Sequence, residues 1–212
     1  SRCATSSLIE IPYIVFCDAL ESLPDVLPPL HNLELSFCQR LICIPGSSLP
    51  TSLRRLDVFD CNRWEFPISE ERMKHYTCLE TLELSYTSEH LVCFPLGVFP
   101  NLRTLWLENC EGLEKVYIPE GLEDDSLASL CGLHIWSCYA LEMIGKETGR
   151  GEATTELPAP NLTALSIKKC GRVKPVVIER EGEVLLPKLQ KLVIDNSASG
   201  ESPHSLTRSS FK

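Results

Sequence analysis

Residues 102–116 read LRTLWLENCEGLEKV, and residues 130–144 read LCGLHIWSCYALEMI. The two stretches share one frame: apolar, two free positions, apolar, one free position, apolar, two free positions, Cys, two free positions, apolar. The alternation around the central apolar pair indicates a short strand with one buried face. The cysteine that follows marks a turn out of that strand.

The same frame recurs along the chain. Its first apolar position falls at residues 9, 30, 53, 79, 102, 130, 162 and 189, so the spacing varies between 21 and 32 residues. Thr87 takes the cysteine position in the unit that begins at residue 79, and Ser197 takes it in the last unit. This period and pattern are typical of leucine-rich repeats.

The predicted fold class is therefore α/β: a leucine-rich-repeat solenoid, or horseshoe, of about eight repeats. A parallel sheet would form its concave face, and irregular loops or short helices its convex face. Residues 68–76 and 124–130 are the expected short helices, and residues 145–161 the longest loop. We expect residues 1–196 to form the repeat domain, as an uncapped fragment, and the Ser-rich residues 197–212 to be a flexible tail.

Six of the eleven cysteines occupy the turn position of the frame: Cys17, Cys38, Cys61, Cys110, Cys138 and Cys170. A thiol is a small, largely apolar group with a weak donor, so these residues fit a buried ladder. Reduced cysteines in such a ladder suit a cytoplasmic protein. The chain contains no C-x-x-C pair, and no metal site is predicted from it.

The charge is mostly acidic, with a net value of −9. The first 159 residues carry 11 basic and 24 acidic side chains, whereas residues 160–200 carry 7 basic and 4 acidic ones. A mainly acidic surface argues against nucleic acid as a partner, because phosphate binding needs a basic face. No apolar run approaches the roughly 18 residues of a membrane helix, so no membrane partner is expected.

Sequence motifs for catalysis are absent. Gly145-Lys146 lacks the remaining residues of a phosphate-binding loop, and no Ser/His/Asp or Cys/His order stands out. We therefore expect no enzyme activity, no catalytic residue and no cofactor in this chain. Asn161-Leu162-Thr163 matches a glycosylation sequon, but it repeats the Asn-Leu pair that also precedes other strands, and we interpret it as a chance match.

Three phrases carry a family resemblance: C-x-x-L-x-x-[LI]-P at 38–45, LPTSLRRLDVFDCNRWEFP at 49–67 and FPLGVFPNLRTLWLENCEGLE at 94–114. They resemble the repeat regions of plant nucleotide-binding leucine-rich-repeat disease-resistance proteins, over nearly the whole chain to about residue 195. The resemblance implies sensing of a pathogen effector or a guarded host protein. It also implies contact with the receptor's own nucleotide-binding domain, whose switch these repeats restrain. Nucleotide would bind only in that switch domain, which this chain lacks.

Two other interpretations remain open at this stage. Cys-containing repeats also occur in leucine-rich-repeat substrate adaptors of ubiquitin ligases, although those repeats are usually more regular. The chain could also be a degenerate receptor fragment without a function.

The candidate partner-binding residues are the free positions beside the central leucines, since these face the concave side. Large aromatic groups rimmed by charge have the composition of a binding hot spot. The predicted residues are Phe59, Glu83, Tyr86, Trp106, Glu108, His134, Trp136 and Lys168. The alternative is that some of these rings fold over neighbouring repeats or meet another domain of the same receptor.

Overall fold

The computed structural model describes most of the repeat region and leaves short gaps in it. The described residues are 13–17, 19–23, 27–42, 50–61, 63, 77–87, 89–119, 122, 126–147, 155–177, 179–180 and 183–195. Their regular secondary structure consists of strands, and none of these residues belongs to a helix that could cross a membrane. The expected tail at 197–212 and the expected helix at 68–76 lie outside the described residues.

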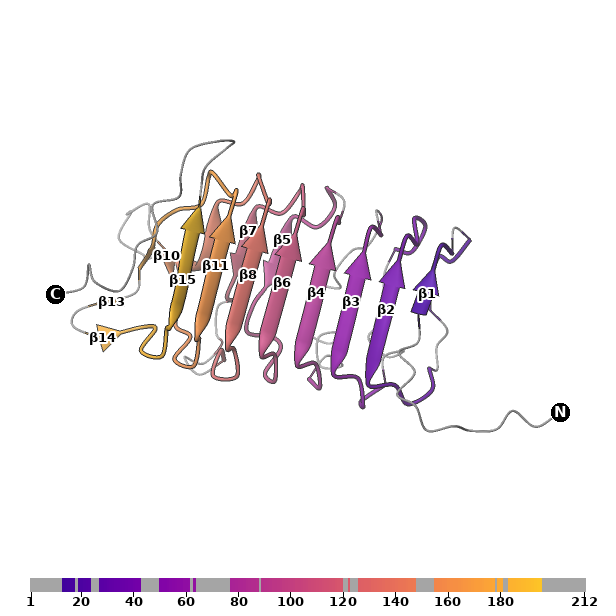
Figure 1. Cartoon of the computed structure of the whole chain (residues 1–212), viewed down its shortest axis with the longest axis horizontal. Helices are drawn as coiled ribbons and strands as arrows, with labels where there is room; N and C mark the ends of the chain where they lie inside the picture. Colours follow the sequence, from indigo (N-terminus) through magenta and orange to yellow (C-terminus); the bar gives the residue numbers. More distant parts are fainter. Residues whose placement is uncertain are drawn as a thin grey trace.

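One parallel sheet of eight strands confirms the repeat frame (Figure 1). The strands lie side by side in chain order, with one repeat contributing one strand. Pairing is in register, so that Leu82 lies opposite Leu105, and Leu105 opposite Leu133. The eight strands are β1 (Tyr13–Val15), β2 (Asn32–Ser36), β3 (Arg55–Phe59), β4 (Thr81–Ser85), β6 (Thr104–Glu108), β8 (Gly132–Trp136), β11 (Ala164–Lys168) and β15 (Lys191–Asp195).

A second, smaller sheet lies on the convex side. Its strand order is β12-β10-β9-β7-β5, and only the β9–β10 pair is antiparallel. Its members are β5 (Cys93–Pro95), β7 (Lys115–Tyr117), β9 (Met143–Glu147), β10 (Thr155–Glu156) and β12 (Val176–Val177). A separate hairpin joins β13 (Glu179–Arg180) to β14 (Glu183–Val184).

Two expectations for the convex side need correction. Residues 145–161 were expected to form one loop, but 143–147 and 155–156 are strands, because β10 finds backbone partners on both β9 and β12. The expected helix at 124–130 is a turn over its described residues 126–129, closed by the Leu130 N–H donating to the Leu127 carbonyl at 3.0 Å. A segment this short cannot offset the cost of starting a helix.

The core is one continuous row of leucines beneath the main sheet. Leu105, Leu107 and Leu113 are almost fully buried, and equivalent residues of the other repeats join the same cluster. Each buried leucine contributes about 1.5–3 kcal/mol relative to an exposed one. Phe94, in β5, and Phe99 stack with their ring centroids 5.6 Å apart and belong to the same buried cluster.

A ladder of thiols lines the turn after the strands. Five of the six predicted ladder cysteines are completely buried, and Cys17, in the first repeat, is half-buried. The thiol of Cys110 lies 3.7 Å from the carbonyl oxygen of Glu108 in its own repeat and 3.7 Å from that of Leu84 in the preceding one. The nine described cysteines are all free thiols. The thiols therefore satisfy carbonyl groups that the turn removes from water.

In the eight-stranded sheet, the residue that follows each strand except β15 has a left-handed backbone conformation. These residues are Phe16, Phe37, Asp60, Tyr86, Asn109, Ser137 and Lys169, with φ between 46° and 57°. Non-glycine residues pay about 1–3 kcal/mol for this conformation. It is retained because each of their N–H groups extends the ladder to the next repeat; that of Tyr86, for example, donates to the Glu108 carbonyl at 2.8 Å. This bend places seven side chains along the C-terminal edge of the sheet, which is the side where the carboxyl ends of the strands lie.

Candidate recognition surface

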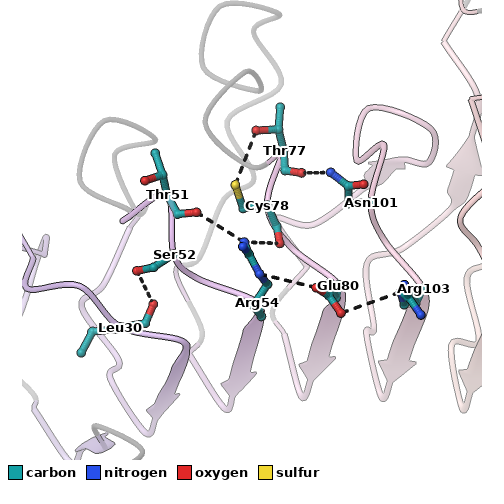
Figure 2. Close-up of polar contacts among 9 residues, drawn as sticks. All are labelled: Leu30, Thr51, Ser52, Arg54, Thr77, Cys78, Glu80, Asn101 and Arg103. Carbon is teal, nitrogen blue, oxygen red and sulfur yellow. Dashed lines mark hydrogen bonds and ion pairs between the residues drawn. The ribbon is translucent and has the colours of Figure 1, made fainter.

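Polar contacts between repeats connect the segments that lead into the amino ends of the strands (Figure 2). Arg54 and Arg103 both pair with Glu80, at 3.5 and 3.7 Å. The Asn101 amide donates to the Thr77 carbonyl at 2.6 Å, and the Asn161 amide donates in the same way to the Ala128 carbonyl. The Asn of the Asn-Leu pair thus connects one repeat to the preceding one, and the amide nitrogen of Asn161 is engaged in such a hydrogen bond.

The concave face presents ordered rows of side chains, because the eight strands pair in register. The middle row runs Glu34, Asp57, Glu83, Trp106, His134 and Ser166 from β2 to β11. The row nearer the C-terminal edge runs Ser36, Phe59, Ser85, Glu108, Trp136 and Lys168. Seven of the eight predicted partner-binding residues therefore lie in two adjacent rows, and Tyr86 follows β4 at the edge.

Trp106, His134 and Trp136 form the first aromatic cluster. The imidazole of His134 stacks on Trp106 with centroids 4.0 Å apart, and Trp136 meets Trp106 edge-on at 5.1 Å. The ammonium of Lys168 lies 4.5 Å from the centre of Trp136, whose indole N–H donates to Ser166 Oγ at 3.1 Å. These rings are half-buried on one another, so the cluster is a preformed, rigid patch on the concave face.

His134 is held in a setting that disfavours its charged form. Burial lowers the pKa of the imidazole, and the positive charges of Lys191 and Lys168 lower it further. Gly132, two residues before His134 in β8, leaves room for the ring, since a Cβ there would lie 3.2 Å from His134 Nε2. The stack therefore favours the neutral form of the His134 imidazole.

A second aromatic cluster follows the C-terminal edge. The rings of Phe16, Phe37, Phe59 and Tyr86 contact in sequence, at centroid distances of 4.6, 5.2 and 5.1 Å. Phe16 is 71%, Tyr86 46% and Phe59 37% exposed. Phe59 and Tyr86 were among the predicted residues, whereas Phe16 and Phe37 were missed. The aromatic residue directly before a ladder cysteine is the signal that could have identified them.

Carboxylates lie beside this second cluster. Arg55 donates to Asp57 Oδ2 at 2.8 Å and to Glu83 Oε2 at 3.0 Å, and the bond to Asp57 raises the pKa of the guanidinium. Burial raises the pKa of Glu83, and the charge of Asp57 adds to this, although Arg55 opposes it. Asp57 Oδ1 is buried without a hydrogen-bond partner among the described residues. The acidic row is therefore only partly neutralised by Arg55.

Comparisons with known proteins identify relatives of this repeat array. A putative disease resistance protein of Arabidopsis thaliana is 38% identical over 133 residues, which is 58% of this chain and 9% of that protein. A probable disease resistance protein of the same plant is 33% identical over 119 residues, 56% of this chain and 11% of that protein. The chain is related to plant disease resistance proteins. It spans about a tenth of the length of these two relatives.

The remaining comparisons add no further relative: no family profile and no solved structure matches the chain. The resemblance expected from the repeat phrases is nevertheless confirmed by the two resistance proteins, as is the solenoid fold by the parallel sheet. This relative of the resistance proteins presents one aromatic cluster and several carboxylates on its concave face, and a second aromatic cluster along the C-terminal edge of the sheet.

Proposed function

We propose that the chain is the non-catalytic protein-recognition module of an intracellular plant immune receptor. In this proposal it senses a pathogen effector or a guarded host protein and restrains the receptor's nucleotide-binding switch domain. The relationship to disease resistance proteins supports the immune role. A cytoplasmic location is part of the same proposal.

The observation that carries the recognition role is the preformed stack of Trp106, His134 and Trp136 on the concave face. Rigid aromatic side chains give a partner a large contact area at low entropic cost, and tryptophan is enriched among interface hot spots. The register of β6, β8 and β11 fixes these rings without requiring any partner. A surface organised in advance in this way suits recognition.

The test uses the receptor that carries this chain, expressed in leaf cells and challenged with a pathogen panel. Trp106→Ala and Trp136→Ala each remove one ring of the stack, and Lys168→Glu changes the same face without removing a ring. Tyr139→Ala is the matched control, because Tyr139 is a 59% exposed ring in the turn after β8.

Loss of the pathogen-dependent response at normal protein abundance supports a sensing surface. A response without pathogen supports a restraining contact with the switch domain. If the three concave-face variants accumulate and respond like the parent and like Tyr139→Ala, the concave stack has no recognition role.

A further inference from the structure

The concave face is divided by charge. Between β2 and β6 it carries four carboxylates, Glu34, Asp57, Glu83 and Glu108, and a single cation, Arg55. Two further cations of the face lie beyond β8, where Lys168 and Lys191 occupy β11 and β15. The half of the concave face that β2, β3, β4 and β6 form is therefore acidic.

Arg55 does not cancel that charge. Its guanidinium bonds to two of the four carboxylates, at 2.8 and 3.0 Å, and one oxygen of Asp57 has no hydrogen-bond partner within the described part of the chain. Ser36 donates to Glu34 at 3.3 Å, which adds a hydrogen bond but no charge. With four carboxylates and one cation, this part of the concave face carries three unbalanced formal negative charges.

A pocket of about 410 Å³ lies at the C-terminal ends of β3, β4 and β6, the strands that carry three of these carboxylates. Three carboxylate residues line it, Asp60, Glu89 and Glu111, together with His90 and the exposed ring of Tyr86. Gln39 from the neighbouring repeat donates to Asp60 and holds it in place. The pocket thus combines an aromatic face with acidic walls, at the end of the row of rings from Phe16 to Tyr86.

We infer that this surface, from the pocket at Tyr86 to the carboxylates of β2–β6, binds a partner-protein segment that carries arginine or lysine beside an apolar side chain. A guanidinium can lie on the Tyr86 ring while its N–H groups donate to the carboxylates around it. The apolar neighbour would contact Phe37 and Phe59. An acidic segment or a phosphate backbone would meet like charge on the same surface.

This inference rests on the proposed recognition function and adds the chemistry of the partner. The experiment uses the full 212-residue chain and two fluorescent peptides of alternating sequence. One peptide alternates arginine with leucine, and the other replaces every arginine by citrulline, which has nearly the same shape but no charge. Affinity is measured by fluorescence anisotropy at low and physiological salt.

The variant Glu89→Gln/Glu111→Gln removes two carboxylates from the pocket. Glu114→Gln/Glu142→Gln is the matched control, because it removes two exposed carboxylates that precede β7 and β9 on the convex side. We expect the pocket variant to bind the arginine peptide about fivefold more weakly, since each exposed pair contributes only modestly, and the control to bind within about twofold of the parent. The citrulline peptide should bind at least about tenfold more weakly than the arginine peptide.

Three results would overturn the inference: no binding of the arginine peptide to the parent chain, equal binding of the citrulline peptide, or an equal loss in the convex-side control. None of these results bears on the stack of Trp106 and Trp136. If that stack is needed for pathogen recognition but the peptide experiment fails, the proposed function stands and only the partner chemistry is wrong.

Discussion

The imidazole of His134 lies almost parallel to the indole of Trp106, with 4.0 Å between ring centroids and 20° between ring planes. The two residues come from adjacent repeats and occupy one register position of β8 and β6. Because the strands are locked in register, the stack is a property of the folded array and is lost when the array unfolds. It therefore links the protonation of one side chain to folding.

We expect acidification to destabilise the fold through His134. The folded environment lowers the imidazole pKa below its ordinary value of 6.5, chiefly by burial. The unfolded chain then binds a proton that the folded chain resists, so the free energy of unfolding falls as the pH drops through 6.5. Urea denaturation at pH 7.5 and at about 5.5, near the range where histidine titrates, measures the loss.

The variant His134→Gln should reduce that pH dependence, because its side chain does not titrate. His31→Gln removes an exposed imidazole from the turn before β2 and serves as the control. If His134→Gln and His31→Gln show the same dependence on pH as the parent, the stack does not resist protonation.

A second prediction concerns Glu83. Its pKa is raised above the ordinary value of 4.5, mainly by burial and then by Asp57. At neutral pH the charged carboxylate therefore lowers the free energy of unfolding. That cost disappears when the pH falls below 4.5 and the carboxyl is protonated in both states. We expect Glu83→Gln to be at least as stable as the parent at pH 7, and equally stable near pH 4.

Urea denaturation at both pH values measures this difference, with Glu89→Gln as an exposed control. A clear loss of stability in Glu83→Gln at pH 7 would show that the bond from Arg55 outweighs the cost of burial. A carboxylate kept at a cost to folding is consistent with a role in binding.

A third prediction concerns the thiols. Burial raises the pKa of Cys61 to about 12, and contact with the thiols of Cys110 and Cys170, together with burial, raises that of Cys138. Since the thiolate is the reactive form, Cys61 and Cys138 should resist alkylation in the native chain. Iodoacetamide labelling with mass spectrometry should modify the partly exposed Cys78, Cys93 and Cys131 well before Cys61 and Cys138. Early labelling of Cys61 in a folded sample would contradict the buried ladder.

The main sheet could be predicted from the sequence because its signal is local. Leu105 and Leu107 alternate with polar neighbours, and one cysteine follows at a fixed distance in most repeats. The convex strands carry no such signal: Lys115–Tyr117 is three residues long, and its pairing with β5 and β9 depends on stacking rather than on its own pattern. Loop lengths that vary between repeats hide that stacking from a linear analysis.

The candidate site was predictable in part for the same reason. Strand register follows from the frame, so Trp106, His134 and Trp136 could be placed on one face before the structure. Phe16 and Phe37 were missed because the frame counts their positions as free; an aromatic residue directly before the ladder cysteine was the available signal, and the left-handed turn shows that they extend the row of Phe59 and Tyr86. The acidic pocket also escaped notice, since it joins residues from three successive repeats.

The last prediction tests the turn after the thiol ladder with two glycines. Gly112 follows Cys110 by two residues, and a Cβ placed on it would lie 2.3 Å from the Glu89 carbonyl oxygen of the preceding repeat. Backbone cannot yield as a flexible side chain can, so Gly112→Ala must push two repeats apart. Overpacking of this kind costs about 2 kcal/mol, which corresponds to a drop of about 6 °C in melting temperature for a chain of this size.

Gly171, directly after Cys170, has open space where its Cβ would be, so Gly171→Ala is the matched control and should melt within about 2 °C of the parent. Thermal unfolding followed by circular dichroism compares the two variants, and equal melting temperatures would show that successive repeats are not in contact at Gly112.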